Sequence, residues 1–165
     1  MPTPSTPQTT SRMPNPMRFV PDIATAAQAL HKVVDGGVLP DATVKLMRLR
    51  VGQLLGSEYF TVRDTADLAK SGETPERIEA VANWTDATCF TDAERVALKL
   101  VDAVHTPNPT GERVSDELYA EASAHYDDEA MWALVLVIGH MGFFAPAALI
   151  AKPIPGMPPG QNYRD

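Results

Sequence analysis

Four side chains in one stretch of the chain, Lys45, Ser57, Tyr59 and Asp64, are of types that bind anions or move protons. Ser57 follows Gly56, and serine is a preferred N-cap residue of helices. A helix N-terminus offers free N–H donors and a partial positive potential, which favour an anion or a charged nucleophile. The stretch therefore predicts a helix that begins at Ser57 and can bind a small anionic group at its start.

The same residues also fit purely structural roles. Lys45 could lie on a solvated stripe of its helix, and Ser57 could serve only as an N-cap. Glu58 is the kind of residue that the helix dipole favours in a first turn. The residue types alone leave open whether this stretch is a site or an ordinary pair of helices.

No other group of side chains has the spacing of a metal site. The four histidines show neither an HxxxH nor an HExxH pattern, and the single cysteine, Cys89, cannot form a CxxC pair. We therefore expect no metal and no cofactor. Cys89 has no basic neighbour in the sequence, which predicts an unreactive thiol. His140 lies in an apolar segment, where it is either a core histidine or a pocket residue.

Hydrophobic periodicity and capping residues predict an all-α chain of about seven helices. Gly56 separates the second helix from the third, and Thr91 forms a capping box with Glu94. We expect a disordered tail over residues 1–16, one domain over residues 17–151 and a Pro/Gly-rich tail over residues 152–165. The expected helices cover residues 23–34, 41–55, 58–70, 75–84, 95–105, 116–126 and a last segment from 128, which Pro146 kinks or ends.

The composition is that of a soluble globular protein, with 44% hydrophobic and 21% charged residues. The formal net charge is −7 and the basic residues are dispersed, so we expect no nucleic acid and no membrane as a partner. The N-terminus lacks the apolar region of a signal peptide, and one cysteine fits a cytoplasmic location. Residues 131–151 are nearly all apolar, which predicts a helix in the core or in a subunit interface.

Several short motifs, in their order and spacing, resemble the AhpD-like alkylhydroperoxidase and carboxymuconolactone decarboxylase superfamily. The resemblance runs from about Ser11 to Phe144. It rests on residues 12–16 (RMPNP), Leu49-Arg50 with Gln53, residues 71–77 (SGETPER), Trp84 and residues 90–95 (FTDAER). The resemblance implies the helical fold of that family and a homo-oligomer, either a trimer or a hexamer.

The resemblance also implies that the peroxidase chemistry of the family is lost. Peroxidase members carry a glutamate, then a CxxC pair at the start of a helix, then a histidine. Lys45 occupies the place of the glutamate, and Asp64 occupies that of the histidine. Ser57 and Phe60 occupy the places of the two cysteines, and neither can form a sulfenic acid or a disulfide. We therefore expect no CxxC peroxidase activity.

The first function that fits is a cofactor-free lyase or isomerase that acts on a small organic acid or a polyketide-like molecule. This branch of the family needs only acid–base groups and an anion site. Lys45 would hold the anion, and Ser57 would donate a hydrogen bond to it. Tyr59 or Asp64 would move the proton.

Two other functions stay open. The chain could be a redox-inactive protein that binds a small molecule or serves as a scaffold, with aromatic rings filling part of the pocket. It could also be a peroxidase that acts through Cys89. The further side chains expected to line the pocket are Glu58, Phe60, His140 and Phe144.

Overall fold

Seven α-helices and no β-strand form the part of the chain that the structure, a computed structural model, describes, which is residues 7–165. The all-α prediction is therefore confirmed. The helices are α1 (Ile23–Val34), α2 (Asp41–Leu55), α3 (Glu58–Lys70), α4 (Pro75–Ala80), α5 (Asp92–His105), α6 (Asp116–Ser123) and α7 (Asp128–Pro146). The 3₁₀ segments η1 (Pro16–Arg18) and η2 (Val81–Asn83) and the π-helical turn η3 (Ala147–Ala151) complete the regular structure.

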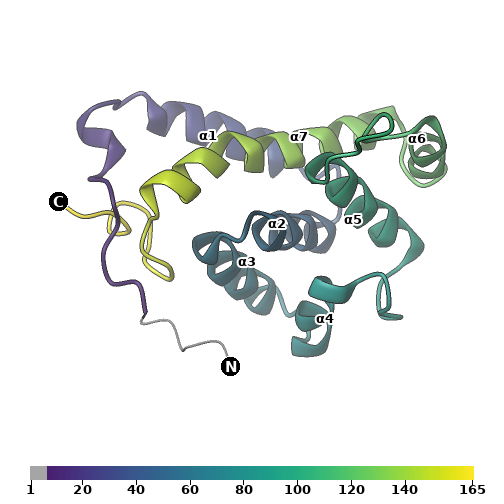
Figure 1. Cartoon of the computed structure of the whole chain (residues 1–165), viewed down its shortest axis with the longest axis horizontal. Helices are drawn as coiled ribbons and strands as arrows, with labels where there is room; N and C mark the ends of the chain where they lie inside the picture. The colour runs from purple at the N-terminus through teal and green to yellow at the C-terminus, as the bar shows by residue number, and fades with distance from the viewer. Residues whose placement is uncertain (1–6) are drawn as a thin grey trace.

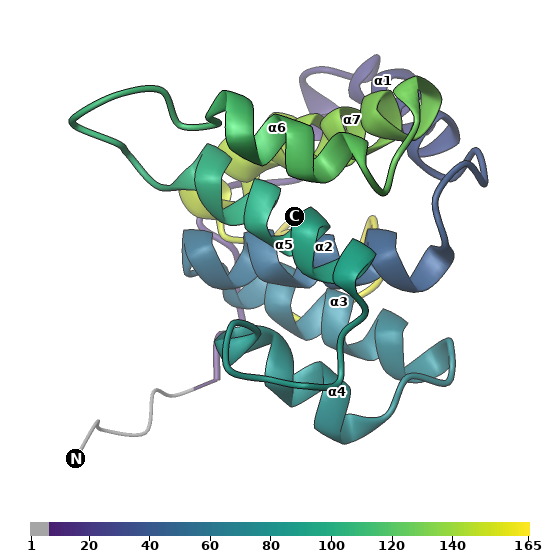
Figure 2. The ribbon, with the colours of Figure 1, turned by 90° about the vertical axis from the view of Figure 1, so that its right-hand side faces the viewer.

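Helix α2 lies at the centre of the molecule, between α7 with α1 on one side and α3 with α4 on the other (Figure 1). Figure 2 shows α5 running beside α2 and α6 lying near α7. The sequence of α2 serves two cores. Met47 packs in the cluster that includes Leu134 of α7, whereas Leu46 packs in the cluster that includes Leu68 of α3. This double burial explains why α2 lacks a single apolar stripe.

The chain reverses between α2 and α3 at Gly56, as the sequence predicts. Gly56 has φ 63° and ψ 31°, a left-handed conformation that glycine adopts without steric cost. The two helices then pack so closely that a Cβ atom at Gly52 would lie 2.9 Å from the Cβ atom of Phe60. This close packing fixes the register of the hairpin and places Arg48 beside Asp64.

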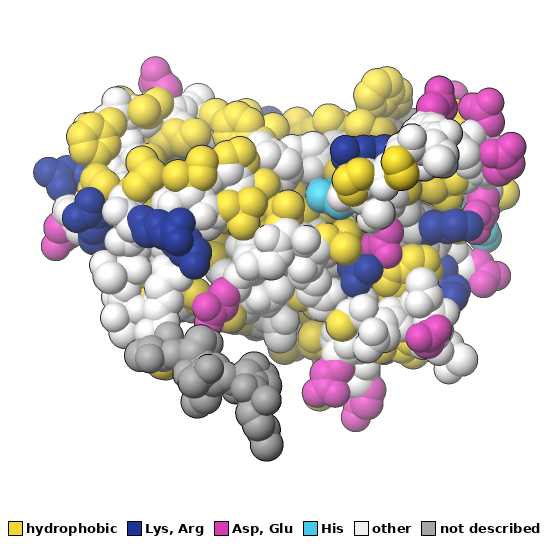
Figure 3. Space-filling model, in the orientation of Figure 1, with side chains coloured by type: hydrophobic (Ala, Val, Ile, Leu, Met, Phe, Trp, Pro, Cys, Tyr) yellow, Lys and Arg dark blue, Asp and Glu magenta, His cyan; other side chains and the backbone are white. Residues whose placement is uncertain are grey.

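Helix α7 is apolar on all sides, and most of it is not covered by the described residues. Only Leu134, Val137, His140 and Met141 are buried in it, and α1 has no buried residue. Figure 3 shows hydrophobic side chains gathered along the edge of the molecule where α1 and α7 run. By length and composition, Asp128–Ala151 could cross a membrane, and 33% of its most apolar window is buried. The exposed large side chains of this segment are Trp132, Val135, Leu136, Phe143, Leu149 and Ile150.

The two ends of the chain lie against each other rather than apart. The N–H of Arg12 donates to the carbonyl of Ala151, and the N–H of Arg164 donates to the hydroxyl of Ser11. Residues 7–16, expected to belong to a disordered tail, are therefore held by the C-terminal segment, while residues 1–6 lie outside the described residues. Their hydrogen-bond partners lie more than a hundred positions away, which local composition cannot reveal.

Candidate functional site

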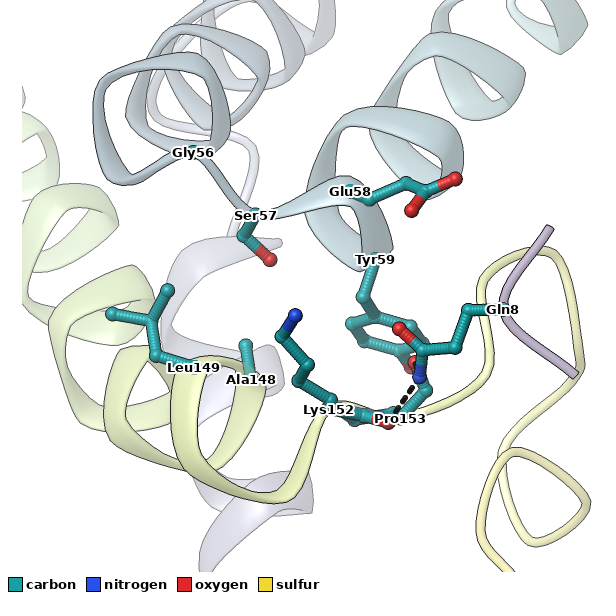
Figure 4. Close-up of a pocket in the computed structure, with 9 residues that line it drawn as sticks. All are labelled: Gln8, Gly56, Ser57, Glu58, Tyr59, Ala148, Leu149, Lys152 and Pro153. Atoms are coloured by element: carbon teal, nitrogen blue, oxygen red, sulfur yellow. Dashed lines mark hydrogen bonds between the residues drawn. The ribbon is translucent and has the colours of Figure 1, made fainter. Parts of the chain in front are cut away.

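A cavity of about 130 Å³ lies at the N-terminus of α3, where the chain reverses (Figure 4). Three parts of the chain that are far apart in the sequence meet around it. These are the N-terminal arm at Gln8, the turn between α2 and α3, and the turn η3 with the two residues that follow it. The lining residues are Gln8, Gly56, Ser57, Glu58, Tyr59, Ala148, Leu149, Lys152 and Pro153.

Ser57 is the N-cap of α3 and is 5% exposed. Its Oγ atom accepts a hydrogen bond from the N–H of Phe60 at 3.3 Å. Among the described residues, no acceptor is found for the proton of the Ser57 hydroxyl. The first turn of α3 also has N–H groups that no helical carbonyl can reach. The walls of the cavity near Ser57 are therefore rich in hydrogen-bond donors.

Lys152 approaches the cavity from the opposite side. It follows η3 and has φ 47° and ψ 70°, a left-handed conformation that is uncommon for residues other than glycine. Its side chain runs toward Ser57, with the ammonium group nearest to the serine hydroxyl in Figure 4. No carboxylate of the described residues lies within 4 Å of this ammonium group. Lys152 therefore brings an unneutralised positive charge to the start of α3.

Tyr59 adds a phenol to the same cavity. Its Oη atom accepts a hydrogen bond of 3.0 Å from Nδ2 of Asn162, which is buried although it lies in the C-terminal segment. Because the oxygen is the acceptor in that bond, the phenol proton is free to be donated to a ligand. The carboxylate of Glu58 is turned away from Ser57 (Figure 4).

Lys45 and Asp64, predicted to converge with Ser57, do not line this cavity. Lys45 forms an ion pair of 2.6 Å with Asp41 at the far end of α2, and Asp64 lies between Arg48 and Arg63. The reason is the register of the hairpin. The reversal at Gly56 brings the end of α2 against the start of α3, but it leaves Lys45 about 15 Å from the end of α2, at a rise of about 1.5 Å per residue. The structure therefore does not bring Lys45 and Asp64 together with Ser57 at this cavity, and their roles in catalysis stay predictions.

Three of the predicted pocket residues also lie elsewhere. Phe60 is 1% exposed and packs in the main core, because position 60 faces α2. His140 and Phe144 form an aromatic cluster with His31 of α1, with ring centroids 4.8 Å apart for the two histidines and 5.3 Å for His140 and Phe144. Glu58 alone of the predicted lining residues is at the cavity.

Sequence reasoning missed the residues that the two chain ends contribute. Lys152 carried a signal, since it is the first charged residue after Glu129 in the long apolar segment. Gln8 and Asn162 carried none, because their positions depend on contacts between the ends of the chain. Cys89 is exposed and is not among the residues that line the cavity. The described residues hold no group of three or more potential metal ligands.

Comparison of the sequence with known proteins gives a match of residues 21–103 to the carboxymuconolactone decarboxylase family. The uncharacterized protein YdfG of Bacillus subtilis is 34% identical over 99 residues, which are 60% of this chain and 66% of YdfG. The uncharacterized protein YnjA of Escherichia coli is 30% identical over 94 residues, which are 57% of this chain and 50% of YnjA. The chain thus spans less than two thirds of the length of each of these relatives.

Comparison of the structure with solved structures gives the same fold. ATU0492 of Agrobacterium tumefaciens, a protein of unknown function, superposes with a TM-score of 0.80 at 22% identity, covering 90% of this chain and 100% of its own. The debrominase Bmp8, as a variant in complex with 2,3,4-tribromopyrrole, superposes with a TM-score of 0.72 at 21% identity, covering 85% of this chain and 74% of Bmp8. At these identities the likeness establishes an AhpD-like fold.

Proposed function

The chain belongs to the carboxymuconolactone decarboxylase family, and from this premise we propose that it binds a small organic acid at the N-terminus of α3. The observation that carries the proposal is the Lys152 ammonium facing the Ser57 hydroxyl across the cavity (Figure 4). An ammonium group and a helix N-terminus both attract a carboxylate. The Ser57 hydroxyl adds a donor that is free of other acceptors.

The size of the cavity sets the size of the acid. A cavity of about 150 Å³ admits benzene, and the one at Ser57 has about 130 Å³. This volume holds a carboxylate with a short aliphatic chain or with part of a single ring. Bmp8, which shares the fold, was crystallised with a single-ring compound. This likeness supports small-molecule chemistry in the present chain without defining it.

The first prediction concerns Lys152. Replacing it with methionine keeps the length of the side chain and removes the charge, so affinity for benzoate should fall at least about tenfold, since hydrogen bonds to charged groups contribute about 1.5–3 kcal/mol. Ser57→Asp keeps a good N-cap but adds a negative charge, and it should abolish benzoate binding. The measurement is an NMR titration of the full chain with benzoate and with uncharged benzamide.

Lys70→Met is the matched control. Lys70 is the last residue of α3 and so lies at the end of that helix opposite to the cavity. This variant should bind benzoate as the wild type does. Equal affinity for benzoate and benzamide, or equal losses in both lysine variants, would refute an anion site at Lys152.

Turnover of the bound acid is a second candidate function, and the free phenol proton of Tyr59 favours it. A positioned general acid or base contributes about 10²–10⁴-fold to a rate. A cofactor-free lyase or isomerase would therefore exchange the C–H protons next to the carboxylate of phenylacetate, which replaces benzoate in samples made up in D₂O because benzoate has no such proton. That exchange would disappear in Tyr59→Phe, whereas a protein that only binds the acid would show no exchange in either form.

We also propose that the chain forms a homo-oligomer, a trimer or a hexamer, through the face formed by α1 and α7. The exposed hydrophobic side chains on α7 and η3 support this, as does the lack of any charged residue between Glu129 and Lys152. Large exposed apolar patches generally mark interfaces. Light scattering should give a mass three or six times 17.9 kDa.

The interface itself is tested by charge insertion. Trp132→Glu combined with Ile150→Glu should shift the mass toward that of the monomer, because both side chains are more than 60% exposed in the single chain. Tyr119→Glu on α6 is the control, since Tyr119 is also exposed but lies on another helix. A monomeric wild type at micromolar concentration would contradict the proposal.

A further inference from the structure

A second cavity, of about 440 Å³, lies where α2, α5 and α7 begin. It shares no lining residue with the cavity at Ser57. Its volume is in the range of small-molecule sites, which is about 300–1,000 Å³. Neither the family nor the proposed function assigns a role to it.

Part of the wall of this cavity is apolar and firmly packed. Leu39 and Tyr126 are 7% and 8% exposed and belong to the main core. The Tyr126 hydroxyl donates to the carbonyl of Ala93 at 2.7 Å, which fixes the orientation of the ring. Burial, with a smaller effect of the Glu94 carboxylate, raises the pKa of Tyr126 to about 12, so the ring stays neutral. An apolar molecule can pack against these two side chains.

Two polar groups of the cavity lack partners. Thr43 is 4% exposed, and among the described residues its hydroxyl has no hydrogen bond. Asp127 caps α7 with one oxygen, which accepts from the N–H of Ala130 at 2.9 Å, and its other oxygen has no partner within residues 7–165. Both the Thr43 hydroxyl and this oxygen are therefore free to bond to a ligand or a water that enters the cavity.

Each of the three helices that begin at this cavity has a partial positive charge of about +0.5 at its N-terminus. The acidic side chains of their first turns more than offset these charges, and the local charge therefore favours a cation. These side chains are Asp41, Asp92, Glu94, Asp128 and Glu129. Of the described residues that line it, none is a lysine or an arginine, and His125 alone is of basic type. Glu94 is already satisfied, since Arg77 and the N–H of Thr91 each donate to it at 2.8 Å. The Asp127 carboxylate is therefore the acidic group that remains available. The net charge of −7 also raises the local concentration of small cations.

We propose that this cavity binds a small lipophilic amine. The ammonium group donates to the free oxygen of Asp127 and to the Thr43 hydroxyl, and the apolar body packs against Leu39 and the ring of Tyr126. A cation near a tyrosine ring gains further attraction from the ring quadrupole. The proposal does not depend on the carboxylate site at Ser57.

The test is an NMR titration of the ¹⁵N-labelled full chain with benzylamine, with benzyl alcohol as the uncharged analogue and benzoate as the anionic one. We expect benzylamine to shift the amide signals of Thr43, Tyr126 and Asp127, with an affinity at least about threefold above that of benzyl alcohol. Asp127→Asn keeps the helix cap, because asparagine caps as well as aspartate, and it should weaken benzylamine binding about three- to tenfold.

Two further variants keep the result interpretable. Thr43→Val, which keeps the shape of the side chain, should also weaken benzylamine binding. Asp128→Asn should not, because Asp128 lies in the first turn of α7 but does not line the cavity. The proposal is overturned by any of three results: equal affinity for benzyl alcohol, equal losses in the Asp127 and Asp128 variants, or no saturable shift at these amides.

Discussion

Replacing Asp64 with alanine is expected to lower the free energy of unfolding by about 3–5 kcal/mol, the usual cost of breaking a buried ion pair from one side. Asp64 is 1% exposed and lies 2.9 Å from Arg48, and both of its oxygens accept from Arg63 at 3.0 and 2.9 Å. The side chain of Arg48 is only 11% exposed. Without the carboxylate, the buried positive charge of Arg48 would keep only the distant Asp67 as a partner, at 3.9 Å, and this loss is the larger part of the cost.

Urea unfolding at neutral pH measures this loss, and Asp67→Ala is the control. Asp67 also approaches Arg48, but at 3.9 Å and with its side chain 37% exposed. Exposed pairs of this kind contribute about 0–1 kcal/mol. If Asp64→Ala unfolds at the same urea concentration as Asp67→Ala, the carboxylate is not a structural element. Asp64, which occupies the position of the family's histidine, would then again be a candidate for proton transfer.

The sequence predicted those parts of the fold that depend on neighbours within four residues. Ser57 accepts from the N–H of Phe60, so α3 begins where expected. Thr91 forms the predicted capping box with Glu94, and α5 begins directly after it at Asp92, three residues before the expected start at residue 95. Gly56 adopts the left-handed conformation that a reversal requires. Such signals are local because a cap or a turn satisfies its own hydrogen bonds.

The parts that sequence reasoning missed depend on distant contacts. The place of Asp64 was clear from its spacing, but its role depends on Arg48, which faces it only because Gly52 lets α3 approach α2 closely. The cation at Ser57 was predicted to be Lys45, and the residue that lines the cavity is Lys152. A cationic side chain would further stabilise an anion bound at a helix N-terminus, but the sequence cannot say which lysine of the chain reaches that place.

His140, like Asp64, was predicted to belong to the site, and its burial instead affects the stability of the protein. It is 2% exposed, and among the described residues neither ring nitrogen has a hydrogen-bond partner. Burial, with smaller effects of the nearby His31, Arg48 and Arg63, lowers the pKa of the imidazole to about 4. The imidazole is therefore neutral in the native protein at neutral pH.

This burial predicts that stability falls in mild acid. In the unfolded chain the imidazole takes up a proton near pH 6.5, whereas in the native protein it stays neutral down to about pH 4. Between these values the unfolded state binds more protons, so the free energy of unfolding decreases as the pH falls through this window and is unaffected above it. The decrease from this residue should reach about 2 kcal/mol at pH 5.

The measurement compares wild type with His140→Phe by urea unfolding at pH 7.5 and at pH 5. Phenylalanine fills a similar volume and cannot be protonated, so the difference in stability between the two pH values should shrink by about 2 kcal/mol in the variant. Comparing this change in the free energy of unfolding between the two proteins removes the contribution of carboxylates that titrate in the same range. His125→Gln, at an exposed position, should keep the wild-type pH dependence. If His140→Phe keeps it as well, then another group responds to the acid, and His140 must have a partner or solvent access in solution.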